Sequence, residues 1–118
     1  MAKVGFVLSN APQGHPGART VYHLAVAALN GGHEVLTYCH KDGVYQLLRG
    51  QHLPDSEEGS PSGWWQALLA RGARVVASEL CARSRGVDSR DLLLEGVRLG
   101  NPADLAKMLI QCDQVISL

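Results

Sequence analysis

The side chains of this sequence that could do covalent chemistry are three thiols, at Cys39, Cys81 and Cys112. They form no CxxC pair, and neither they nor the five scattered histidines show the spacing of a zinc site. We therefore expect no disulfide framework and no metal centre. Three free cysteines remain, and each needs its own explanation.

Cys81 is the main candidate for a reactive thiol. It follows the apolar run at residues 73–77, at the expected start of a helical turn, and Arg83 and Arg85 come shortly after it. Nearby cations and a helix N-terminus both stabilise the thiolate, which is the form that attacks sulfur. Against this, the carboxylate of Glu79 would raise the thiol pKa. A free cysteine also often serves as a small buried apolar residue, so both roles stay open here.

The other two thiols are better explained by packing. Cys112 continues an apolar stripe with Leu105 and Met108 along the last helix, so we expect it in the core. Cys39 ends an apolar run beside His40, but no third residue can be named that would orient a reactive Cys/His pair. We expect Cys39 to be a packing residue as well.

A second candidate site is the turn-rich segment before the first helix. Gly14 and Gly17 lead into that helix, with His15 and Arg19 alongside, and the free N–H groups of a helix start can bind an anion. The segment has neither G-x-G-x-x-G nor G-x-x-x-x-G-K, so dinucleotide and P-loop binding are not supported. A solvated glycine-rich turn explains the same residues, and both interpretations stay open.

Composition limits the possible function classes. A chain of 118 residues predicts a single domain over residues 1–118. Eleven basic residues balance eleven acidic ones, which gives no field to attract nucleic acid or an anionic membrane. We do not expect the N-terminal segment to act as a signal peptide, and no run of about 18 apolar residues occurs. We therefore expect a cytoplasmic protein.

Apolar runs of strand length alternate with segments of helical spacing. Strands are expected at 3–9, 34–39, 73–77, 96–99 and 115–118, and helices from 19 to 30, at 44–49, from 61 to 72, at 88–93 and from 102 onward. Residues 51–62 have the composition of a surface loop. Uninterrupted apolar strands predict a parallel sheet of about five strands with helices on both faces, a three-layer α/β fold. Sites in such sheets lie beyond the carboxyl ends of the strands, where both candidate segments fall.

Three stretches together resemble a known family: GGHEVLTYCHKDGVY, ARVVASELCARSRGVD and GNPADLAKMLIQCDQVISL. Their order and spacing resemble the DsrE/DsrF/TusD-like sulfur-relay proteins over nearly the whole chain. The resemblance implies a flavodoxin-like sheet and assembly into homo- or hetero-oligomers, trimers or hexamers. It also implies a cysteine that takes persulfide sulfur from a donor protein and passes it to an acceptor protein, with no cofactor.

Counting back from Arg85, the cysteine of the DsrE and TusD subunits falls at Ser78 in this sequence. Cys81 stands three residues later, where other branches of the family have a cysteine. The resemblance thus assigns sulfur transfer to Cys81. From their charge and place in the sequence we expect Arg83 and Arg85 to support its thiolate, with Ser78 as a further supporting residue. Two alternatives remain: a structural subunit without a working cysteine, and a small-ligand or anion-binding module that uses the Gly14–Arg19 loop.

Overall fold

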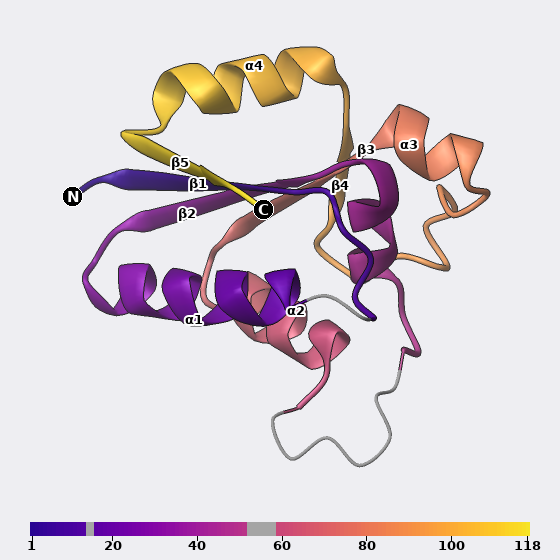
Figure 1. The fold of residues 1–118 in the computed structure, drawn as a ribbon, viewed down its shortest axis with the longest axis horizontal. Helices are drawn as coiled ribbons and strands as arrows, with labels where there is room; N and C mark the ends of the chain where they lie inside the picture. Colours follow the sequence, from indigo (N-terminus) through magenta and orange to yellow (C-terminus); the bar gives the residue numbers. More distant parts are fainter. Residues whose placement is uncertain (14–15, 52–58) are drawn as a thin grey trace.

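The computed structural model describes residues 1–13, 16–51 and 59–118. Within them, five parallel strands form one sheet in the order β4-β3-β2-β1-β5 (Figure 1). The strands are β1 (Lys3–Leu8), β2 (Glu34–Cys39), β3 (Arg74–Ser78), β4 (Arg98–Gly100) and β5 (Gln114–Ser117). The all-parallel α/β fold expected from the sequence is confirmed.

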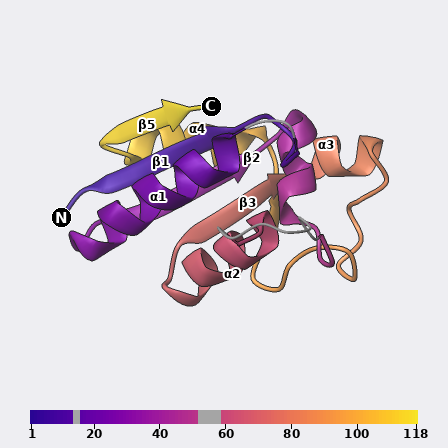
Figure 2. The same ribbon diagram turned by 60° about the horizontal axis from the view of Figure 1, so that its bottom comes forward.

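Helices cover both faces of the sheet, as predicted. They are α1 (Gly17–Asn30), α2 (Pro61–Ala70), α3 (Glu79–Ser84), α4 (Pro102–Gln111) and the 3-10 helix η1 (Lys41–Leu47). Helices α1 and α2 lie together on one face and α4 lies on the other (Figures 1 and 2). None of the helices in the described residues is long and apolar enough to span a bilayer.

Local capping chemistry fixes where two of the helices begin. Asn101 and Asp104 form a reciprocal capping box at the start of α4, in which each side chain accepts a hydrogen bond from the other residue's backbone N–H. Ser60 caps α2 by accepting from the N–H of Gly63, with Pro61 in the first turn. The helix starts expected at Asn101-Pro102 and Ser60-Pro61 are therefore confirmed.

Two expected elements differ from the structure. Residues 88–93 form turns instead of a helix, because Leu93 makes a bridge with Leu48 and the side chain of Arg90 donates to the carbonyl of Val97. The helix expected at 44–49 is instead the 3-10 helix η1, which begins three residues earlier and ends at Leu47. The surface loop expected at residues 51–62 lies mostly outside the described residues.

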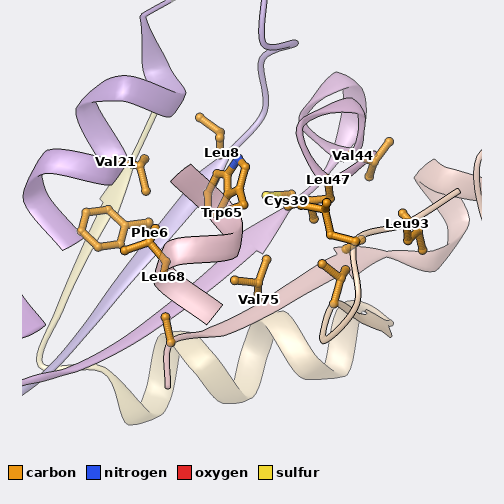
Figure 3. Packing of buried hydrophobic residues seen from close by; sticks show 14 of the residues in the cluster. Phe6, Leu8, Val21, Cys39, Val44, Leu47, Trp65, Leu68, Val75 and Leu93 are labelled. Atoms are coloured by element: carbon orange, nitrogen blue, oxygen red, sulfur yellow. The ribbon is translucent and has the colours of Figure 1, made fainter. Parts of the chain in front are cut away.

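The main core lies between the sheet and the pair α1 and α2 (Figure 3). Trp65 is its largest side chain, 1% exposed, and packs in this core with Phe6, Leu8 and Leu68. Trp64 lies differently: it is half-buried and stacks on Tyr22, with ring centroids 5.8 Å apart. A smaller cluster on the opposite face lies under α4. Both faces of the strands are therefore buried, as their apolar runs predict.

The carboxyl ends of β1, β2 and β3 lie at one edge of the sheet. Leu8 is in register with Cys39, and Cys39 with Ala77, so these three strands end level with one another. The chain continues from β2 into η1 and from β3 into α3 at this edge, and η1 and α3 lie side by side there (Figures 1 and 2). The edge therefore brings residues 41–47 close to residues 78–85.

Candidate functional site

Ser78 joins strand β3 directly to helix α3. It is the last residue of the strand, its backbone is extended, and its hydroxyl oxygen accepts a hydrogen bond of 3.2 Å from the N–H of Cys81. This is an N-cap interaction, so α3 starts without an intervening loop. Cys81 consequently lies in the first turn of α3, partly exposed, with one side against the main core.

Hydrogen bonds and charges around the Cys81 sulfur favour its thiolate. Partial burial acts to raise the pKa of the thiol. Hydrogen bonding with the Ser78 side chain and the Lys41 backbone acts to lower this pKa, as do the positive charges of Arg85 and Lys41. These interactions outweigh burial and hold the pKa of Cys81 below its ordinary value.

The backbone of Lys41 has a left-handed conformation, with φ of 52°. The surrounding segment is held on the end of β1, because the N–H of His40 donates to the carbonyl of Leu8 at 3.1 Å. Gly43 lies so close to that same carbonyl that a Cβ there would overlap it. These contacts fix the turn that presents the N–H of Lys41 to Cys81. Sequence reasoning missed Lys41, although its place at the carboxyl end of a parallel strand was a usable signal.

Arg85 ties the two segments of the site together. Its Nε donates to Oδ1 of Asp42 in η1 at 3.0 Å, and its Nη1 donates to the carbonyl of Cys81 at 3.1 Å. One half-buried guanidinium thus bridges η1 and α3 and places positive charge beside the thiol.

Arg83, the second arginine expected to support the thiol, points elsewhere. Its guanidinium pairs with Glu79 at 2.6 Å and lies 3.9 Å from Asp88. The positive charge near Cys81 comes from Arg85 and Lys41. Pairing with Arg83 also offsets the charge of Glu79, the carboxylate that the sequence analysis weighed against a reactive Cys81.

Tyr38 extends the hydrogen bonding of Ser78 into the sheet. The side chain of this β2 residue is 3% exposed and is hydrogen-bonded to the side chain of Ser78. Burial raises the pKa of Tyr38, the contact with Ser78 acts to lower it, and the negative charges of Cys81 and Asp104 raise it further, so the pKa lies above its ordinary value. Ser78 therefore lies between a buried phenol and Cys81, an arrangement not predicted from the sequence.

A model of the DsrE/DsrF-like family matches residues 2–118, nearly the whole chain. The chain belongs to the DsrE/DsrF-like family. The resemblance inferred from its sequence motifs is thereby confirmed.

Relatives and solved structures of similar sequence or fold agree with this family. An uncharacterized protein of Methanopyrus kandleri is 34% identical over 110 residues, which cover 93% of this chain and 88% of the relative. The protein named sulfurtransferase TusD homolog of Pseudomonas aeruginosa is 29% identical over 92 residues, 77% of this chain and 68% of its own. The crystal structure of the ychN protein from E. coli matches all of both chains with a TM-score of 0.89 and 25% identity.

The other two thiols of this DsrE/DsrF-like chain differ from Cys81. Cys39 is fully buried in the main core, as expected, and burial raises its pKa strongly (Figure 3). Cys112 lies just beyond the end of α4 and is partly exposed, and it packs with Leu105 against the smaller core cluster, as its place in the apolar stripe predicts. Burial and the charge of Asp113 raise the pKa of Cys112 despite the nearby Lys3. Cys81 is the thiol with a lowered pKa.

The candidate anion-binding loop is placed only in part. Gly14 and His15 lie outside the described residues, while Gly17 is buried and Arg19 exposed in the first turn of α1. Across residues 1–13, 16–51 and 59–118, no three His, Cys, Asp or Glu side chains gather as they would around a metal ion.

Proposed function

We propose that this protein is a sulfur-relay protein in which Cys81 carries sulfur as a persulfide. Membership of the DsrE/DsrF-like family supports the proposal, as does a relative named sulfurtransferase TusD homolog. The observation that carries it is the setting of Cys81: partly exposed, with two hydrogen-bond donors and two cations around its sulfur. Such surroundings make a cysteine nucleophilic near neutral pH.

The proposed chemistry consists of two thiol exchange steps. The Cys81 thiolate attacks the outer sulfur of a donor persulfide, a new S–S bond forms, and the donor leaves as a thiolate. Later an acceptor thiolate attacks the outer sulfur now on Cys81, which breaks that bond and returns Cys81 as a thiolate. The sulfur atom moves with no net oxidation or reduction, so the exchange requires no metal or organic cofactor.

The thiolate must leave as well as attack, and the same contacts serve both steps. The donors from Ser78 and Lys41 stabilise negative charge on the Cys81 sulfur before loading and again when it becomes the leaving group. Arg85 follows α3 and pairs with Asp42 in η1, so it joins the segment of Ser78 to the segment of Lys41. We assign Ser78 and Arg85 as positioning residues and Cys81 as the sulfur carrier.

We further propose that the donor and acceptor are proteins in the cytoplasm and that the chain acts as a trimer or hexamer. Leu80, next to Cys81, is 69% exposed and offers an apolar contact to a partner. On α4, Leu109 and Ile110 are 50% and 84% exposed and suit a subunit contact.

The test is limited alkylation of the reduced native protein near neutral pH, followed by mass mapping of the modified cysteine. Cys81 should react first, Cys112 slowly, and Cys39 only after unfolding. A parallel sample treated with inorganic polysulfide should gain one sulfur atom on Cys81. Cys81→Ser should abolish this gain, and Cys112→Ser, the matched control, should keep it.

Loading on another cysteine would move the site away from Cys81. Absence of loading on any cysteine would favour the structural-subunit alternative. Ser78→Cys restores the position at which similar DsrE and TusD subunits carry their cysteine. If only that variant takes up sulfur, Cys81 is not the carrier.

A further inference from the structure

Lys41 combines an unusual backbone conformation with a place directly beside the Cys81 thiol. Among the described residues it is the single non-glycine with positive φ. Residues other than glycine, asparagine and aspartate rarely adopt a positive φ. Such a strained backbone persists where surrounding contacts impose it. Here the contacts are Gly43 against the Leu8 carbonyl and the pairing of Asp42 with Arg85.

The positive φ of Lys41 explains how its backbone faces Cys81. It does not explain why the residue at this position is a lysine. The N–H of residue 41 would reach the sulfur equally well from glycine, which adopts positive φ without strain. Lysine adds an ammonium group whose charge acts on Cys81. In the described residues no carboxylate pairs with this ammonium, whereas Arg83 and Arg85 both have acidic partners. The side chain is exposed, and Arg85 contacts both the adjacent Asp42 and Cys81, which places the Lys41 turn beside the thiol.

We propose that Lys41 is a second functional residue of the site, whose ammonium binds the negatively charged terminal sulfur of a persulfide on Cys81. This inference rests on the proposed function. Loading places a second sulfur beyond the Cys81 sulfur, and after loss of its proton that terminal atom carries the negative charge. Ser78 and the Lys41 backbone lie beside the inner sulfur, so the exposed ammonium of Lys41 suits the outer one. The same charge selects anionic sulfur donors over neutral ones.

The first test needs no sulfur transfer. Native protein is alkylated at Cys81 with anionic iodoacetate and, separately, with neutral iodoacetamide, and the ratio of the two rates reports the local charge. Removing one ammonium several ångströms away in a water-like dielectric changes an anion's rate by about threefold. Lys41→Gln and Lys41→Gly should therefore lower the iodoacetate to iodoacetamide ratio by about that factor. High salt should remove most of the difference, because it screens exposed charges.

The matched control is Lys107→Gln, which removes an exposed ammonium from α4. Its ratio should equal that of the unchanged protein. Glycine at position 41 relieves the strained φ while glutamine retains it, so equal effects of both substitutions point to the charge. A ratio unaffected by Lys41→Gln, or lowered equally by Lys107→Gln, would overturn the assignment.

The second test measures loading of Cys81 by inorganic polysulfide. Lys41→Gln should slow it by a similar factor of about three at low salt. If the unchanged protein loads sulfur and Lys41→Gln loads it equally fast, the inference fails and the proposed function stands. If the unchanged protein takes up no sulfur, the proposed function fails, and the assignment of Lys41 to a persulfide fails with it.

Discussion

Replacing Ser78 by alanine tests whether the hydroxyl beside Cys81 is a working part of the site. The oxygen has three roles: it accepts from the N–H of Cys81, it donates to the Cys81 sulfur, and it is hydrogen-bonded to Tyr38. Ser78→Ala removes all three and leaves the backbone and the thiol in place. Both the stability of the protein and the reactivity of Cys81 should therefore change.

The expected magnitudes follow from the individual contacts. Loss of a serine N-cap lowers the free energy of unfolding by about 1 kcal/mol. A hydrogen bond to a charged group contributes about 1.5–3 kcal/mol, and the lower figure applies because Cys81 is partly exposed to water. About 1.4 kcal/mol corresponds to a tenfold change in the thiolate population. Removing a group that stabilises the thiolate raises the thiol pKa, so alkylation near neutral pH should slow by about tenfold.

The assay is the rate of iodoacetamide modification of Cys81 as a function of pH, together with urea denaturation. The midpoint of the rate profile should move to higher pH in Ser78→Ala, and the two proteins should react alike at alkaline pH, where both thiols are ionised. Ser60→Ala is the matched control, because it removes the serine N-cap of α2, whose hydroxyl accepts from the N–H of Gly63, and it should lower stability without slowing the reaction of Cys81. If Ser78→Ala loses stability but reacts within twofold of the unchanged protein, the hydroxyl is a helix cap and nothing more.

Two further predictions concern packing and assembly. Gly43→Ala should lower the free energy of unfolding by about 2 kcal/mol, because its Cβ would overlap the Leu8 carbonyl; urea denaturation measures this. The control Gly63→Ala lies in α2 with ordinary space around its Cβ and should be neutral or stabilising, so equal losses in both variants would contradict the packing argument. Light scattering of the isolated chain at micromolar concentration should give the mass of a trimer or hexamer. A monomer in this measurement would contradict the proposal that the chain assembles with itself.

Most of the fold was readable from the sequence because its signals are local. Apolar runs without alternation indicated parallel strands buried on both faces, and the Asn101-Pro102 pair marked the start of α4. The exceptions depend on tertiary contacts. Residues 88–93 have helical spacing but form turns, since bridging to Leu48 brings Leu93 into the core. Pairing between segments this far apart in the chain leaves no local signal in the sequence.

The sequence indicated the candidate thiol, but it indicated only some of the residues that surround it. Cys81 followed from its place after an apolar strand. Lys41 did not, because it reaches Cys81 only when β2 lies next to β3, and the order of strands in a sheet is not a local property. For the arginines a signal existed: Glu79 and Arg83 are four residues apart on one helix, the spacing of a side-chain ion pair. Because this spacing pairs Arg83 with Glu79, it indicates Arg85 as the arginine that lies near the thiol.

The three-residue spacing between Ser78 and Cys81 gives a physical account of the contact between the two side chains. Positions i and i+3 at a helix start lie on the same face, so a side chain at residue 78 necessarily meets one at residue 81. Serine is a good cap, and its hydroxyl both accepts from the N–H of Cys81 and donates to the sulfur. A cysteine at position 78 would be a poorer hydrogen-bond partner in both directions. The residue at the strand end therefore contacts Cys81, and Arg85 and the Lys41 turn lie beside the same residue.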